Sequence, residues 1–98
     1  MVRPIRCRRI RFQPNVTYFK PAGIRMIELQ EVTITFDEFE AVRLKDLEEL
    51  EETEAAKKMS ISQPTFNRLV KQARKKISDA IVHGKALKIE GGNIKFVR

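Results

Sequence analysis

A break between two helix-forming stretches constrains this chain more than any other feature of its sequence. Residues 54–76 read EAAKKMSISQPTFNRLVKQARKK, in which alanine, lysine and glutamate favour helix on both sides of Met59. The next residues, Ser-Ile-Ser-Gln-Pro, suit no helix interior, because serine competes for backbone hydrogen bonds and proline lacks an N–H. The sequence therefore predicts a helix over residues 52–59, a short turn, and a second helix over residues 63–82 that is ended by Gly84.

Side chains around the break meet the requirements of a helix-turn-helix motif. Ala55 and Ala56 are small where the two helices must approach closely. Ser62 is a natural N-cap, and Pro64 is tolerated in the first turn because its missing N–H would have no intrahelical partner there. The side chains expected to lock the helices together are Met59, Ile61, Phe66 and Leu69. We therefore expect a helix-turn-helix whose second helix enters the major groove of DNA.

The helix predicted over residues 63–82 has two faces of different chemistry. Apolar side chains recur at spacings of three and four and should form one buried face: Phe66, Leu69, Val70, Ala73 and Ile77. The rest of its N-terminal half is basic, amide-bearing or small and polar, the chemistry of a helix that reads base edges. The residues we expect to contact DNA are Ser62, Gln63, Pro64, Thr65, Asn67, Arg68, Lys71, Gln72, Arg74 and Lys75. The alternative is a helical hairpin with a solvated basic face.

Residues 35–49 are predicted to form a further helix. Thr35 and Glu38 make a capping box, in which the threonine caps the helix and the glutamate reaches back to its start. An apolar stripe is expected on its inward face, made by Phe36, Phe39, Val42, Leu44 and Leu47. The chain before residue 35 is broken by proline and glycine, and its candidate strands are residues 8–12 and 31–35.

The last residues return to a strand pattern. Residues 86–97 read ALKIEGGNIKFV, in which Gly91 and Gly92 separate two alternating runs, a spacing typical of a two-residue β-hairpin. We therefore expect a mainly α fold with small β additions in a single domain. Its parts would be a basic arm and strand segment at residues 1–34, a helix-turn-helix domain at 35–84 and a C-terminal β-hairpin at 85–98.

Charge is unevenly distributed along the chain, whose net charge is +7. Residues 1–25 hold seven basic and no acidic side chains, residues 26–56 two basic and eleven acidic ones, and residues 57–98 eleven basic and two acidic ones. Such basic faces favour a polyanionic partner, because each neutralised phosphate releases counterions. The N-terminal arginines expected to contact DNA, as an arm in the minor groove or from a strand lying on phosphates, are Arg3, Arg6, Arg8 and Arg9. Otherwise they only make the chain soluble.

The acidic run DLEELEETE at residues 46–54 is expected to be a solvated face that keeps DNA away from that side. The alternative is a docking surface for a basic partner such as RNA polymerase.

Residue types that build most active sites and metal sites are scarce. Cys7 is the only cysteine and His83 the only histidine, so neither an internal disulfide nor a metal site is expected. No nucleophile is accompanied by a base, so the chain is not expected to be an enzyme. No apolar run approaches the ~18 residues of a membrane span, and no signal peptide is visible, which favours a cytoplasmic protein without a membrane partner.

The runs RCRRI and FKPAG, with the stretch from TFDEFEAV to KIEGG, resemble a family of small, largely uncharacterised bacterial and archaeal proteins predicted to bind DNA. The resemblance covers nearly the whole chain. Residues 36–77 are also similar to the DNA-binding fourth region of sigma factors, in the winged-helix-like superclass. That similarity implies a supporting helix at 52–59 and a recognition helix whose Gln63, Pro64 and Arg68 lie nearest the bases. It also implies phosphate contacts from the turn and from Lys71 onward.

The chain departs from that pattern at two positions. Glu49 after the first helix and Ser60 in the turn stand where such motifs often have glycine, and a non-glycine residue in left-handed geometry costs about 1 kcal/mol. Some members of the resembling family carry an added domain like an iron-molybdenum-cofactor-binding fold. Since the sequence ends at Arg98, neither such a domain nor a cofactor is expected here.

We therefore expect a sequence-specific, double-stranded DNA-binding protein of a prokaryote that regulates transcription. The alternatives are an RNA-binding module using the same basic surfaces and a protein adaptor docking through the acidic helices. A homodimer is also expected, since one recognition helix reads only a few base pairs. The side chains expected to join two copies are Ile10, Phe12, Leu87, Ile89, Ile94 and Phe96. The other possibility is that they pack on the helices of their own chain.

Overall fold

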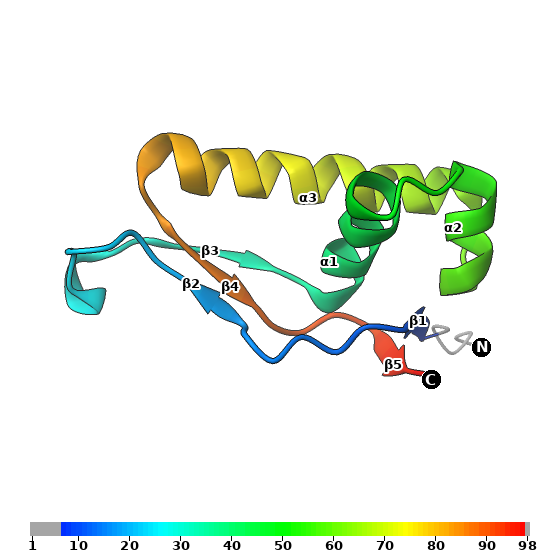
Figure 1. Cartoon of the computed structure of the whole chain (residues 1–98), viewed down its shortest axis with the longest axis horizontal. Helices are drawn as coiled ribbons and strands as arrows, with labels where there is room; N and C mark the ends of the chain where they lie inside the picture. Colours follow the sequence, from blue (N-terminus) through cyan, green and yellow to red (C-terminus); the bar gives the residue numbers. More distant parts are fainter. Residues whose placement is uncertain (1–6, 98) are drawn as a thin grey trace, which may run out of the picture.

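The computed structural model describes residues 7–97, whose arrangement is shown in Figure 1. The elements in chain order are β1 (Arg8–Ile10), β2 (Tyr18–Phe19), the 3-10 turn η1 (Met26–Glu28), β3 (Glu31–Ile34), α1 (Phe36–Val42), the π-helical turn η2 (Arg43–Leu47), α2 (Glu52–Met59), α3 (Gln63–His83), β4 (Ala86–Ile89) and β5 (Ile94–Phe96). The fold is mixed α/β. The helix α3 runs along one side of the molecule, with α1 and α2 beside its N-terminal half and the strands β2, β3 and β4 below its C-terminal half.

The helix α1 begins at the predicted capping box. The Thr35 hydroxyl accepts from the Glu38 backbone N–H at 3.4 Å, and the Glu38 carboxylate accepts from the Thr35 N–H at 3.0 Å. Regular helix gives way to η2 at Arg43, and the backbone turns left-handed at Glu49, with φ of 57°. The helical segment was predicted to end near residue 49, and it ends two residues earlier, at Leu47, so the prediction is confirmed to within two residues.

The apolar stripe predicted for α1 is wrong at Leu47, which is 73 % exposed. Of the other four side chains Leu44 is buried, and Phe36, Phe39 and Val42 are partly buried. The inward positions are held by Ala41 and by carboxylates, namely Asp37, Glu38 and Glu40. The helix tolerates this because each carboxylate has a cationic partner within the fold, so that burial leaves no charge unpaired.

The helices α2 and α3 have the predicted starts and are joined by a tight turn. Ser60 is left-handed, with φ of 58° and ψ of 43°, and the Ile61 N–H donates to the Ala56 carbonyl at 3.0 Å. The Ser62 hydroxyl caps α3 by accepting from the Thr65 N–H at 3.3 Å. The main core lies between these helices, α1 and β1, and comprises Ile10, Ala41, Leu44, Ala55, Ala56, Met59, Phe66, Leu69 and Val70. The expected locking role of Phe66 fits its complete burial.

The predicted C-terminal hairpin is wrong, because β4 and β5 belong to different sheets. One sheet has the order β2-β4-β3, with β4 antiparallel to β2 and parallel to β3, and the other pairs β1 with β5 in parallel. Between them the chain crosses the start of α1, where the Phe36 N–H donates to the Gly91 carbonyl at 3.0 Å. A Cβ atom on Gly92 would lie 2.8 Å from an Asp37 oxygen. The glycine is therefore needed for a close approach, and its positive φ of 100° suits the crossing instead of a hairpin turn.

The strands β1 and β2 near the start of the described chain thus pair with β5 and β4 near its end. Ile10 and Ile89 are buried, and Ile94 is partly buried against the main core. Phe12 and Phe96 contact Phe39 and Phe36 of α1, so at least five of the six side chains expected to join two copies pack within their own chain. Phe12 and Phe96 remain 50 % and 39 % exposed.

Candidate nucleic-acid interface

The outward face of α3 displays nearly all the side chains that the sequence assigned to DNA contact. Thr65 is partly buried, and its hydroxyl accepts a hydrogen bond from the Ser62 hydroxyl at 2.9 Å. The other nine residues are exposed, and they are Ser62, Gln63, Pro64, Asn67, Arg68, Lys71, Gln72, Arg74 and Lys75. The buried face is the predicted one, with Phe66, Leu69, Val70 and Ala73 buried and Ile77 partly so. The tertiary fold therefore leaves one basic, amide-bearing side of α3 open to solvent.

The cations on this face differ in whether an acid neutralises them. Arg74 donates through Nε to Asp46 at 3.0 Å, and this hydrogen bond raises the pKa of Arg74 and lowers the pKa of Asp46. Among residues 7–97, Arg68, Lys71 and Lys75 form no ion pair. Three cations therefore remain available for an external anion, whereas Arg74 is held against η2.

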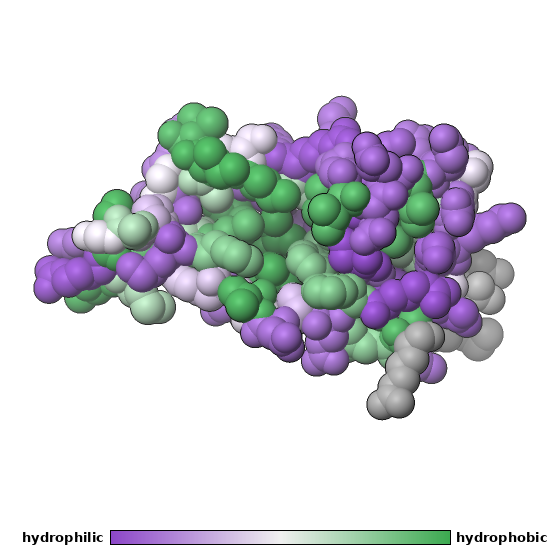
Figure 2. Space-filling model, in the orientation of Figure 1, coloured by the Kyte–Doolittle hydropathy of each residue, from purple (hydrophilic) through white to green (hydrophobic). Residues whose placement is uncertain are grey.

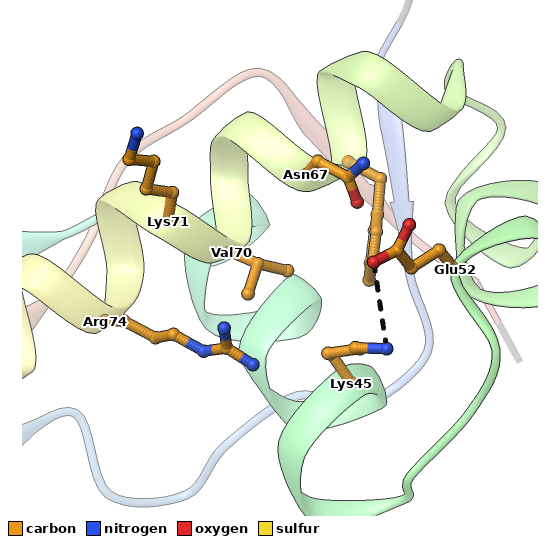
Figure 3. A pocket seen from close by; sticks show the side chains of 7 residues that line it. Lys45, Glu52, Asn67, Val70, Lys71 and Arg74 are labelled. Carbon is orange, nitrogen blue, oxygen red and sulfur yellow. Dashed lines mark ion pairs between the residues drawn. The ribbon is translucent and has the colours of Figure 1, made fainter.

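A pocket of about 270 Å³ opens between α3 and the segments that face it, as Figure 3 shows. Asn67, Val70, Lys71 and Arg74 contribute from α3, Lys45 from η2 and Glu52 from α2. Lys45 Nζ lies 3.9 Å from a Glu52 oxygen, and the Arg74 side chain extends across the opening toward this pair. Phe66 closes its floor. The rim thus offers three cations and one acid, an arrangement that accepts a sugar-phosphate segment more readily than an apolar molecule.

Glu52 also contacts the exposed face of α3. The Gln63 amide donates to a Glu52 oxygen at 3.5 Å, which links the first residue of α3 to the first residue of α2. Three residues of this surface were not predicted from the sequence to belong to it: Lys45, Asp46 and Glu52. Their positions follow from the packing of η2 and α2 against α3, which no local pattern in the sequence encodes.

The N-terminal arginines expected to contact DNA are only partly described by the structure. Arg3 and Arg6 lie outside the described residues. Arg8 lies in the strand β1, its side chain is only 25 % exposed, and its Nε is 3.5 Å from Asp37 Oδ2. Arg9 points to the other side of the strand and is exposed. Only Arg9 of this pair is therefore placed to meet an external phosphate.

The family described as "Protein of unknown function DUF134" has a sequence pattern that matches residues 1–97. This chain belongs to that family. Similar DUF134-type chains are named UPF0251 proteins: one from Thermoanaerobacter pseudethanolicus is 54 % identical, over 97 % of this chain and 80 % of the relative. A second, from Thermoanaerobacter sp. strain X514, is 54 % identical over 97 % and 84 %, and a third, from Caldanaerobacter subterraneus, is 56 % identical over 97 % and 80 %. No solved structure matches the chain.

The resemblance to a family of small, uncharacterised bacterial proteins is thereby confirmed. The similarity to the fourth region of sigma factors stays a prediction, since these names state no activity.

In this DUF134 chain, two buried carboxylates of α1, Glu38 and Glu40, tie α3 and the chain after β1 to α1. The Lys76 ammonium donates to Glu38 at 2.7 Å and ties α3 to α1. The Arg43 guanidinium donates to both oxygens of Glu40, at 2.7 and 3.1 Å, and the Arg11 backbone N–H donates to Glu40 at 2.8 Å. The sequence does contain one signal for this cluster, the i,i+3 spacing of Glu40 and Arg43, which matches neighbours on a helix surface. The burial of Glu40 could not be predicted from that spacing.

Within residues 7–97 no set of three histidine, cysteine, aspartate or glutamate side chains is arranged to hold a metal ion. None of the helices in the same part of the chain is long and apolar enough to cross a membrane. Cys7 is exposed and its thiol lies 3.4 Å from the Asn93 side-chain oxygen.

Proposed function

We propose that this chain binds double-stranded DNA sequence-specifically and regulates transcription, with the N-terminal half of α3 lying in the major groove. The observation that carries the proposal is the pairing pattern on α3. Arg68, Lys71 and Lys75 are exposed and have no acidic partner among residues 7–97, while the opposite face of the helix is packed into the core. A helix about 10–12 Å wide fits the major groove, and its groove-facing side must carry donors that are free to meet bases and phosphates.

Each part of the helix has a distinct task in this proposal. Gln63 and Asn67 are one turn apart on the outward face and supply amides, which read adenine edges, while Arg68 supplies the fork that suits guanine. Lys71 and Lys75 lie further along α3, where the groove wall brings phosphates. The Ser60 turn holds α2 across the start of α3, so α2 supports the reading helix from behind.

The acidic side supports the same orientation. Glu48, Glu49 and Glu51 are exposed on the segment between η2 and α2. Phosphates are repelled from this segment, so only the α3 side of the molecule is electrostatically suited to approach a duplex.

A docking role for the acidic side is the second candidate, and one observation favours it. Leu47 is 73 % exposed among acids, beside a groove of about 470 Å³ that is lined by Phe12, Phe39 and Val42. An apolar groove with an acidic rim suits a basic amphipathic segment, such as one on RNA polymerase. An RNA-binding module has weaker support, because the major groove of A-form RNA is too narrow for a helix.

The proposal is tested by selecting bound sequences from a pool of random duplexes at stated salt, with the unchanged chain and with Arg68→Ala. We expect a short consensus for the unchanged chain and a relaxed preference at one base pair for the variant. Arg25→Ala is the matched control, since Arg25 is exposed at the other end of the molecule and pairs with Glu28. Binding without any consensus, or duplex RNA competing as well as duplex DNA, would contradict the proposal.

A further inference from the structure

One surface of the molecule plays no part in the proposed DNA contact, and it is apolar. It is formed by Phe19 of β2, Ile77 and Ile81 of α3, and Leu87 of β4, and is called here the distal face. Figure 2 shows it as a continuous hydrophobic area between the C-terminal half of α3 and the strands below. Ile81 is 76 % exposed and Phe19 is 52 % exposed. A groove of about 420 Å³ runs through the face.

The distal face is exposed because the main core does not extend along the C-terminal half of α3. The main core takes only Phe66, Leu69 and Val70 from α3, although the helix continues to His83. Beyond Ala73 the helix is covered by the small β2-β4-β3 sheet on one side only. The apolar stripe nevertheless continues through Ile77 and Ile81 at a spacing of four. The stripe therefore continues to Ile81, which residues 7–97 leave exposed, whereas Ile77 is partly buried.

We propose that a second copy of this chain covers the distal face, so that the protein is a two-fold dimer joined through the C-terminal halves of its α3 helices. This relocates the expected dimer interface from the terminal β segments to α3 and the strand face beside it.

Further apolar side chains lie exposed at the same end of the molecule. Met26, Ile27 and Val82 are 60 %, 85 % and 74 % exposed. With Phe19 and Ile81 they make five large apolar side chains that are more than half exposed, and a standard-size interface buries roughly 800 Å² on each partner. Contiguous apolar patches beyond a few hundred Å² are rare on monomers.

The shape and charge of the surface fit a copy of itself. A two-fold interface requires a projection and a recess on the same face, and Ile81 projects beside the groove that it helps to line. Lys20 and Lys85 line the groove, and the charge of Lys85 is paired within the chain, because Asp79 lies 3.1 Å from Lys85 Nζ. Two positively charged chains can therefore meet here without setting only like charges against each other.

The dimer also sets the distance between the two α3 segments that contact DNA, an inference that rests on the proposed function. Ile81 lies fourteen residues after Asn67, or about 21 Å along the helix axis. Two reading segments related by an axis near Ile81 are then separated by at most about 42 Å, and a modest inclination of the helices brings them to the roughly 34 Å of one DNA turn.

The test is sedimentation equilibrium of the full chain, without DNA, at micromolar concentration in moderate salt. We expect a mass near twice 11.4 kDa. Ile81→Glu should raise the dimer dissociation constant by roughly tenfold or more, since it places a charge in the centre of the contact. The site is exposed, so the variant should fold, which an unchanged circular dichroism spectrum checks. Leu47→Glu is the matched control, because Leu47 is equally exposed on η2 and should leave the dimer intact.

The outcomes separate the interface from the proposed function. A monomer at all concentrations, or a dimer that Leu47→Glu dissociates and Ile81→Glu does not, would overturn the interface even if the chain binds duplex DNA. A dimer that Ile81→Glu dissociates supports the interface even if no duplex is bound, in which case the proposed function fails alone. If both hold, Ile81→Glu should protect about half the length of duplex protected by the unchanged chain.

Discussion

Arg43 donates two hydrogen bonds to the carboxylate of Glu40, at 2.7 and 3.1 Å, and Glu40 is completely buried. The hydrogen bond to Glu40 raises the pKa of Arg43, which keeps the guanidinium charged. Since the same carboxylate accepts the Arg11 N–H, the pair connects α1 to the chain that leaves β1. The pair therefore stabilises the side of the core against which α3 packs.

Glu40→Gln should lower the free energy of unfolding by about 3–5 kcal/mol, because it leaves the Arg43 charge without its buried partner. Urea denaturation measures the change. Glu48→Gln is the control: Glu48 is the exposed second partner of Arg43, at 3.5 Å, and its loss should cost less than about 1 kcal/mol. Equal effects of the two substitutions would show that burial does not strengthen the Glu40 contact.

Arg68→Ala and Lys75→Ala should weaken DNA binding in different ways. The arginine variant should lose about 1–3 kcal/mol on the selected sequence, with relaxed preference at one base pair, most plausibly a guanine. The lysine variant should weaken all sequences alike and reduce the slope of log K against log salt by about one. Fluorescence anisotropy on selected and random duplexes at several salt concentrations measures both. Identical losses on both duplexes for both variants would remove the assignment of roles on α3.

Asp46→Asn should strengthen binding to random duplexes, because it releases Arg74 toward the phosphates. The slope of log K against log salt should steepen by about one. Glu28→Gln changes the net charge by the same amount at the far end of the molecule and is the control, expected to have little effect. Unchanged affinity in Asp46→Asn would mean that Arg74 does not reach the DNA.

The Asp46–Arg74 pair should not act as a switch near neutral pH. The hydrogen bond from Arg74 lowers the pKa of Asp46 from 3.8, so the stabilisation is present above that ordinary value and is lost only as the pH falls through the lowered pKa. The affinity difference between the unchanged chain and Asp46→Asn should therefore be the same at pH 6 and pH 8, measured at matched salt. A difference that disappears toward pH 6 would contradict this assignment.

Ser60→Gly should stabilise the protein by up to about 1 kcal/mol, because Ser60 adopts left-handed geometry, which glycine reaches without strain. Thermal unfolding measures the gain. The reverse change at the end of α3, Gly84→Ser, should destabilise by a similar amount, since Gly84 has φ of 65° and already meets the requirement. A loss of stability in Ser60→Gly would mean that the serine side chain contributes to the turn.

The helical part of the fold and the exposed face of α3 could be predicted from the sequence because their determinants are local. The Ser62 cap and the capping box at Thr35 each depend on a few neighbouring residues, and both are found in the structure. The left-handed geometry at Glu49 and Ser60, which the resemblance to sigma-factor motifs implied, is also found. The side of α3 that faces solvent followed from the spacing of its apolar residues for the same reason.

The β segments were predicted less well because their partners are distant in the chain. Gly91 and Gly92 have the positive φ values that a hairpin would need, yet β4 pairs with strands more than fifty residues earlier and β5 pairs with β1. A two-strand pairing within the last residues would satisfy fewer backbone groups and cover less apolar surface than these two sheets do. The same limitation affected Arg8, whose pairing with Asp37 depends on where β1 lies.

The sequence by itself determined the limits of α2 and α3, the turn between them and the chemistry of the α3 face, because capping, backbone conformation and helical periodicity act over a few residues. Only the tertiary structure decided which charges are free. Arg74 is neutralised by Asp46, Glu40 is buried under Arg43, and Ile81 is left uncovered, since each outcome depends on segments far apart in the chain being brought within a few ångströms of one another.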